Sequence, residues 1–250
     1  IISPEREVAK TLYRKLEAPG ALDNVPFVKD KVKLLEILIE KKCPIANIPL
    51  KDLTKKFPEF KAYVFGAERK ENFVFFKKND QMKVGDKVYL VVNTEQINKL
   101  LSVFGHDEKV AQKILIIGGG NIGLHLAKLL ESTEGLRTKI IEKNKERAEQ
   151  LAGELSSAIV INGDPLDEKI LKEANIEEAE TVFALTDDDE DNIMACVLAE
   201  KYTPSKRTIA IINKHNYNIL QDSLKIDDLV DPRMTTVSTI MKHVHMGTID

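Results

Sequence analysis

A strand, a glycine-rich turn, a helix and a second strand follow one another over residues 113–144, and this unit constrains the fold more than any other part of the chain. The run KILIIGGGNIGLHLAKLL is followed by TKIIEKN, in which Glu142 ends the second strand. Gly118, Gly120 and Gly123 occupy the glycine positions of the G-x-G-x-x-G pattern. The first allows a tight turn, the second lets the backbone approach a pyrophosphate, and the third brings helix and strand together. We therefore predict a dinucleotide-binding turn of the Rossmann type.

The helix that is predicted to begin near Asn121 would direct its unpaired N–H groups, which carry roughly half a positive charge, toward a phosphate. Glu142 lies 24 residues after Gly118, where a carboxylate can accept hydrogen bonds from ribose hydroxyls. The alternative is a glycine-rich strand–helix turn that binds no ligand. Because strand, turn, helix and acid all occur in the required order, we favour the nucleotide site.

Composition sets wider limits. The chain has 250 residues and 43% hydrophobic content, which is enough for a core in one or two domains. Its 37 basic and 40 acidic residues give a net charge of −3, so there is no general electrostatic basis for binding nucleic acid. The apolar runs are far shorter than the ~20 residues that span a bilayer. Cys43 and Cys196 are too few for a disulfide or metal framework, and we expect a reducing cytoplasm.

Three parts follow one another along the chain. Residues 1–24 begin with an amphipathic helix that Pro19-Gly20 stops, and residues 25–108 form a small α+β domain. Strand-like runs in this domain are 31–39, 62–66, 72–76 and 87–92. Residues 109–250 alternate strand-length apolar runs with helix-length segments; the runs are 113–118, 138–142, 158–162, 181–186 and 208–213. The predicted fold class is α/β, a doubly wound parallel sheet with a second, smaller α+β domain.

Polar residues end most of these apolar runs. The carboxyl ends of parallel strands share one edge of the sheet, where ligands bind in doubly wound folds. We therefore expect the site at the residues that end the runs: Glu142, Gly163, Asp164, Thr186, Asn213 and Lys214.

The two ends of the chain resemble each other. Residues 2–23 parallel residues 230–250, with Pro4 matching Pro232 at an offset of about 228 residues. The chain also begins with Ile1 and not with Met. We expect it to be one period of a tandem array, in which residues 1–24 are the crossover helix of a preceding, absent Rossmann unit. Two unrelated amphipathic helices are the alternative.

Together these features resemble the RCK/KTN family (regulator of potassium conductance), most closely the regulatory subunits of Trk-type potassium uptake systems. The marks are GGGNIG at 118–123, Glu142, Gly163-Asp164, and TDDDEDN at 186–192, which is similar to the family's T-x-x-D-x-x-N. The segment INKHNY at 212–217 places Lys214 where the family often has arginine. An ammonium group there replaces the planar guanidinium, which can bind a phosphate through two hydrogen bonds.

The resemblance implies a regulatory subunit and no enzyme. It would lie in the cytoplasm on the inner face of the membrane, bind NAD(H), or ATP/ADP, and couple binding to gating of a Trk-type potassium-transporting membrane subunit. It would form a homo-oligomer (a dimer or a ring) and would not bind nucleic acid. The implied nucleotide site comprises Gly118, Gly120, Asn121, Ile122, Gly123, Glu142, Lys143, Gly163, Asp164, Thr186, Asp189, Asn192 and Lys214. We predict no catalytic residues, since the sequence shows no nucleophile–base pairing. We predict no metal-binding residues, because there is no zinc spacing and the acids at 187–191 suit the first turn of a helix.

Two other functions remain open. An NAD-dependent oxidoreductase, with the small domain supplying substrate contacts, needs a proton donor beside the nicotinamide, and no evident His or Lys fills that role. A DNA-binding redox sensor needs a basic recognition helix, whereas the lysines of the small domain are spread out. We rank the regulatory module first, the enzyme second and the DNA sensor third.

Overall fold

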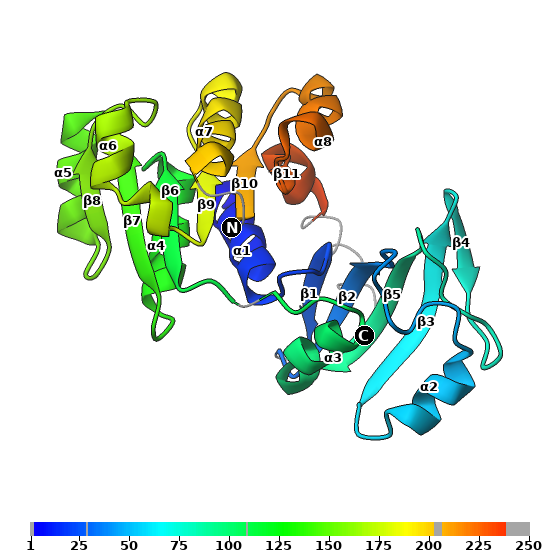
Figure 1. The fold of residues 1–250 in the computed structure, drawn as a ribbon. Coiled ribbons are helices and arrows are strands. Elements are labelled where there is room, and N and C mark those ends of the chain that lie inside the picture. Colours follow the sequence, from blue (N-terminus) through cyan, green and yellow to red (C-terminus); the bar gives the residue numbers. More distant parts are fainter. Residues whose placement is uncertain (1–2, 29, 109, 203–206, 239–250) are drawn as a thin grey trace. The chain divides into compact units, whose positions relative to one another are not determined.

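A computed structural model describes residues 3–28, 30–108, 110–202 and 207–238. The chain divides into two compact units, which are labelled by element in Figure 1. The larger unit contains residues 1–13 and 111–250, and the smaller contains residues 14–110. Each unit has a sheet of its own.

The larger unit is built on a six-stranded sheet in which every pairing is parallel, with the order β11-β10-β9-β6-β7-β8. The strands are β6 (Lys113–Ile117), β7 (Arg137–Glu142), β8 (Ile159–Asn162), β9 (Thr181–Ala184), β10 (Arg207–Ile211) and β11 (Asp228–Val230). The strand order reverses between β6 and β9, which is where doubly wound sheets bind ligands. The predicted fold class is therefore confirmed. Only β11, a three-residue edge strand, was not predicted.

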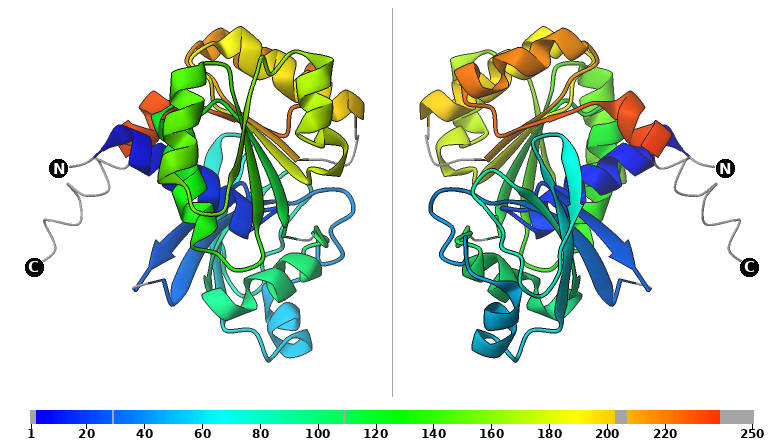
Figure 2. Two further views of the ribbon diagram at one scale, coloured as in Figure 1. Left: turned by 90° about the vertical axis from the view of Figure 1, so that its left-hand side faces the viewer. Right: turned by 90° about the vertical axis from the view of Figure 1, so that its right-hand side faces the viewer.

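Helices lie on both faces of this sheet (Figures 1 and 2). They are α4 (Asn121–Glu131), α5 (Lys145–Glu154), α6 (Glu168–Glu173), α7 (Asp189–Tyr202) and α8 (Gln221–Leu224), with 3-10 turns η2 (Ile176–Glu178) and η3 (His215–Leu220). The central strand β9 is buried along its whole length, as expected for a parallel strand that is covered on both faces.

The first helix, α1 (Pro4–Glu17), crosses the boundary between the units at Tyr13. Its Val8 and Leu12 side chains are buried, and the Tyr13 hydroxyl lies 2.7 Å from the hydroxyl of Thr133. That this helix belongs to a preceding unit stays a prediction. Residues 232–238 are helical as well, whereas the rest of the matching repeat lies outside the described residues.

The smaller unit is a five-stranded antiparallel sheet in the order β1-β2-β5-β3-β4. Its elements are β1 (Asp23–Phe27), β2 (Val32–Leu38), α2 (Leu50–Lys56), β3 (Ala62–Arg69), β4 (Asn72–Phe75), β5 (Lys87–Asn93), η1 (Thr94–Gln96) and α3 (Ile97–Val103). Alternate residues of β2 and β5 are buried in a core to which α2 and α3 contribute. The sequence did not indicate β1 because Pro26 interrupts it, but β1 is an edge strand, where proline is tolerated.

The carboxylate of Asp86 is buried in this unit and paired with the partly exposed guanidinium of Arg69. Asp86 is 1% exposed and accepts two hydrogen bonds from Arg69, at 2.8 and 2.6 Å, and one from the backbone N–H of Lys83 at 2.8 Å. Burial by itself would raise the pKa of Asp86, but these hydrogen bonds outweigh it and lower the pKa. The ionised form of Asp86 is therefore the form that the fold stabilises.

Replacing Asp86 by Asn should lower the free energy of unfolding of the small unit by about 3 kcal/mol, because Arg69 would lose its counter-charge. Since the folded pKa of Asp86 is depressed, this contribution is present above the unfolded pKa, about 3.9, and is lost as the pH falls below it. The difference in unfolding free energy between the Asp86→Asn variant and the original chain should therefore shrink in acid. Hydrogen exchange of β3 and β5 amides against denaturant would measure it.

Glu68→Gln is the matched control, since Glu68 pairs with Lys87 at 3.4 Å on the exposed part of the same sheet. Its cost should stay below about 1 kcal/mol. Equal costs for the two variants would contradict the role given to the pair of Asp86 with Arg69.

Candidate functional site

The glycines of the turn after β6 are required for different reasons. Gly118 has a φ of +100°, and a Cβ there would lie 2.7 Å from the backbone nitrogen of Thr186. A Cβ on Gly123 would lie 2.2 Å from the carbonyl oxygen of Gly118. By contrast, a Cβ on Gly120 would meet no described atom within 4 Å, and its φ is −60°. Packing therefore explains two of the three glycines, whereas the space at Gly120 is open to a group that approaches from outside the fold.

The open space at Gly120 faces the start of a helix. Gly120 is the N-cap of α4, and among the described residues no side chain caps this end and no acid lies in its first turn. Asn121 is exposed and Ile122 is half-buried at the first two helical positions. The first N–H groups of a helix lack intrahelical partners and attract anions, so this terminus suits a phosphate.

Glu142 ends β7 and is bonded directly to the glycine turn. One carboxylate oxygen accepts the N–H of Gly119 at 2.7 Å, and the other accepts the N–H of Asn144 at 2.7 Å. Each oxygen has a second lone pair, so the carboxylate can still accept hydrogen bonds from a ribose. The strand end and the turn are thus held together before any ligand binds.

Two residues of this arrangement were not predicted from the sequence. A Cβ on Gly119 would lie 2.2 Å from the Leu151 side chain and 3.0 Å from Glu142. Arg147, in the first turn of α5, donates from Nε to the carbonyl of Gly119 at 2.8 Å, while its buried Nη2 has no hydrogen-bond partner in the described structure. The third consecutive glycine and an arginine five residues after the acid were the available signals.

The loops that follow β7 and β8 lie beside this turn. The N–H of Gly163 donates to the carbonyl of Glu142 at 3.0 Å. Lys143 and Asp164 form an ion pair at 2.8 Å, which lowers the pKa of Asp164 and raises that of Lys143. Both side chains are well exposed, so the pair contributes little to stability and is free to rearrange around a ligand.

Beyond β9, Thr186 is held by a buried amide. Asn192 is fully buried; its Oδ1 accepts the N–H of Thr186 at 2.9 Å, and its Nδ2 donates to the carbonyls of Thr186 and Ile211, each at 3.1 Å. This amide therefore ties the ends of β9 and β10 together. Thr186 in turn lies against Gly118.

The loop after β10 is anchored by an acid of α7, the helix that also carries Asn192. Asp189, 4% exposed, accepts the backbone N–H groups of Asn213 at 3.0 Å and Lys214 at 2.9 Å. Lys214 Nζ donates to Glu190 at 2.6 Å. This bond and one from the hydroxyl of Tyr217 lower the pKa of Glu190 to about 2. Lys214 is thus paired with an acid that a phosphate would have to displace.

The structure brings the predicted residues together in two sets. The turn, Glu142 and the neighbouring Gly163 are joined by direct bonds, and Lys143 and Asp164 pair beside them. Asp189 and Asn192 support Thr186 and the β10 loop through hydrogen bonds with backbone groups. Which of these residues contact a ligand stays a prediction.

The described ranges contain neither a metal-binding cluster nor a membrane-spanning helix. No group of three or more His, Cys, Asp or Glu side chains is arranged to hold a metal ion there. None of the helices in those ranges combines the length and the apolar content needed to cross a membrane.

Comparison with known proteins identifies the two units. The TrkA-N domain model matches residues 114–232, and the TrkA-C domain model matches residues 34–105. The Trk system potassium uptake protein TrkA of Azorhizobium caulinodans is 40% identical over all 250 residues, which cover 54% of that protein. The TrkA of Vibrio alginolyticus is 32% identical over 249 residues, again covering 54% of it. The chain thus spans about half the length of these relatives.

Solved structures share the fold. The RCK domain of GsuK matches 99% of the chain and 52% of its own length, with a TM-score of 0.65 and 17% identity. The GsuK channel bound to NAD matches 96% of the chain and 42% of its own length, with a TM-score of 0.64 and 15% identity. On the two domain models and these relatives, the chain belongs to the RCK/KTN family and carries the TrkA-N and TrkA-C domains of Trk potassium uptake proteins.

Proposed function

We propose that this chain is a nucleotide-binding regulatory part of a potassium uptake system, in which binding of NAD(H) or an adenine nucleotide changes the gating of a membrane subunit. The observation that carries the proposal is the open space at Gly120. It lies at an uncapped helix N-terminus, and Glu142 is held beside the same turn. A pyrophosphate at the helix and a ribose at the carboxylate would use these features together.

The choice of ligand class rests on chemistry and on fold. GsuK, a channel of the same fold, has been solved bound to NAD. NAD(H) and ATP both carry an adenosine ribose, so a contact from Glu142 would not separate them. We propose NAD(H) as the ligand, with ATP or ADP as the alternative.

A regulatory role fits the titratable groups at the site better than catalysis does. Lys143 is paired with Asp164, and Lys214 with Glu190. Glu142 is bonded to two backbone N–H groups. Regulation requires only that a ligand bind two conformations with different affinity, and a coupling of about 1–3 kcal/mol is typical. A coupling of this size would change the open fraction of the membrane subunit several-fold without any chemical reaction. We propose that the chain lies in the cytoplasm, at the inner face of the membrane.

Glu142 should exclude a 2′-phosphate. In calorimetric titrations we expect NADPH to bind at least about tenfold more weakly than NADH, because two negative charges would face each other. Glu142→Ala should weaken the binding of NADH and reduce the difference in affinity between NADH and NADPH. Glu149→Ala on α5 is the control, since Glu149 makes only a 3.9 Å pair with Lys145. Equal affinity of the unmodified chain for both nucleotides would remove Glu142 from the ribose site.

Gly120→Val should abolish nucleotide binding while leaving the free energy of unfolding within about 1 kcal/mol of the original, because the new side chain fills space that the fold leaves open. Gly153→Val, at a helical position that is also open, is the control and should bind normally. In the full-length protein assembled with its membrane subunit in liposomes, Gly120→Val should also make potassium flux independent of the nucleotide supplied.

Two results would overturn this proposal. One is steady oxidation of NADH by the purified chain with 2-oxo acids, which would favour the oxidoreductase. The other is flux through the unmodified full-length assembly that does not depend on which nucleotide is present.

Self-association is the remaining part of the proposal. The sequence spacing of Val237, Ile240, Met241 and Val244 (i, i+3, i+4, i+7) predicts an apolar stripe on a helix. Val237 is 51% exposed, and the other three lie outside the described residues. We expect a dimer or a larger ring, and Ile240→Asp with Val244→Asp should shift it toward monomer in sedimentation velocity. A chain that is monomeric at about 100 μM would contradict this, since obligate assemblies persist at such concentrations.

A further inference from the structure

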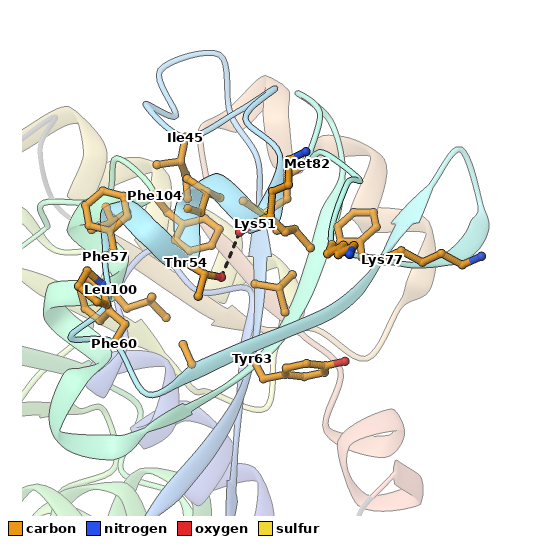
Figure 3. Close-up of a pocket in the computed structure, with 18 residues that line it drawn as sticks. Ile45, Lys51, Thr54, Phe57, Phe60, Tyr63, Lys77, Met82, Leu100 and Phe104 are labelled. Carbon is orange, nitrogen blue, oxygen red and sulfur yellow. Dashed lines mark hydrogen bonds between the residues drawn. The ribbon is translucent and has the colours of Figure 1, made fainter.

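The small unit contains a cavity of about 420 Å³ under α2 (Figure 3). It is lined by side chains from α2, from β3, from α3 and from the segments 57–60 and 76–82. Most of these side chains are apolar, including Phe57, Phe60, Met82, Leu100 and Phe104. This volume is in the range of small-molecule pockets, which are mostly apolar with a few polar groups.

The helix that covers this cavity is loosely packed. None of the seven residues of α2, all of which are described, is fully buried, and Leu50 and Leu53 are only half-buried against the core. The helix is held instead through its backbone, by bonds from Leu50 N–H to the Asp80 carbonyl at 3.0 Å and from Lys51 N–H to the Lys78 carbonyl at 2.8 Å. The pocket is half open to solvent, and a concavity of this size beside a loosely packed helix leaves room for a guest.

The charged groups of the pocket all have one sign. Lys51, Lys77 and Lys78 line it, and no acidic residue is among its described lining residues. Within the described ranges, none of the three lysines has an acidic partner among the ion pairs (compare Lys87 with Glu68 in the same unit). Figure 3 shows Lys77 at the opposite end of the pocket from Phe57 and Phe60. The lining therefore has an apolar part and three lysines, with the carboxylate of Asp80 bonded to the backbone N–H of Lys77 at 2.6 Å.

We propose that this pocket binds a small amphiphilic anion, a monocarboxylate with an unbranched apolar chain of medium length. The hydrocarbon chain would lie among Phe57, Phe60 and Phe104, and the carboxylate would lie at the lysines. Apolar lining gives affinity through burial of the chain, and the ammonium groups select the anion over a neutral molecule of the same length. This site lies in the small unit and is separate from the nucleotide site, so each can be tested without the other.

Calorimetric titration of the purified 250-residue chain with hexanoate, octanoate and decanoate, each below its micelle concentration, tests the proposal. Affinity should rise about fourfold per added methylene, as expected for burial of the chain. At low salt, each carboxylate should bind at least about fivefold more tightly than the alcohol of equal length. That preference should fall as salt is added, because the lysines are exposed.

Two variants separate the apolar and cationic parts. Ala62→Phe places a ring in the pocket from β3 and should abolish binding of both carboxylate and alcohol. The surface variant Lys51→Gln with Lys77→Gln and Lys78→Gln should keep alcohol binding and lose the preference for carboxylate, and it does not depend on repacking the core. Its matched control changes three exposed lysines of the same unit that do not line the pocket: Lys55→Gln, Lys61→Gln and Lys99→Gln.

Three results would overturn the proposal. The first is no saturable binding of any chain length up to ten carbons. The second is equal binding of carboxylate and alcohol at low salt. The third is carboxylate binding that weakens as the protein concentration rises, which would assign the pocket to side chains of a second copy. None of these results would affect the nucleotide titrations, which use Glu142 and Gly120.

Discussion

The close approach of three backbone segments at Gly118 is the constraint on which the larger unit depends. At this point the end of β6 touches the end of β9, and the first turn of α4 passes over the carbonyl of the same residue. A single added methyl group at Gly118 or Gly123 would intrude on backbone atoms, which cannot move aside as a side chain can. The strand order reverses between β6 and β9, so this contact brings the helix N-terminus to the edge of the sheet where ligands bind.

Polar side chains then hold the other strand ends at this edge by binding backbone groups. Glu142 binds the N–H of Gly119, Asn192 binds Thr186 and Ile211, and Asp189 binds the loop after β10. Buried polar groups are costly unless their hydrogen bonds are made, and here these side chains meet that need while joining the segments. These loops are therefore held in place by the fold, and a ligand would not have to order them itself.

The sequence predicted those features that depend on local pattern. Each of the five apolar runs became a strand, and the G-x-G-x-x-G spacing placed α4 with its start at Asn121. Edge strands were less visible, since β11 has only three residues and Pro26 lies within β1. These two strands are defined by their neighbours more than by their own residues.

Contacts between distant residues escaped prediction for a different reason. Arg147 reaches the carbonyl of Gly119 across 28 positions, and Asp189 reaches the N–H of Lys214 across 25. For the Arg147 contact the sequence offers only an indirect signal, an arginine five residues after Glu142. For the Asp189 contact it offers none, because an aspartate at a helix start is ordinary in itself. The sequence predicted that the acids at 187–191 lie at a helix start. It did not predict that Asp189 binds the backbone of the loop after β10.

If the proposed function holds, the glycine turn and Glu142 would supply affinity without discriminating between NAD and NADH. They would contact the pyrophosphate and the adenosine ribose, which NAD and NADH share. A ligand with equal affinity for two conformations shifts nothing, however tightly it binds. Discrimination would then have to arise at the other half of the crevice, beyond β9. There Lys214 is bound to Glu190 on an exposed surface, and Thr186 is fixed by the buried Asn192. A rigid threonine, and a cation that must first leave its acid, would respond differently to a charged nicotinamide, a neutral one or a phosphate.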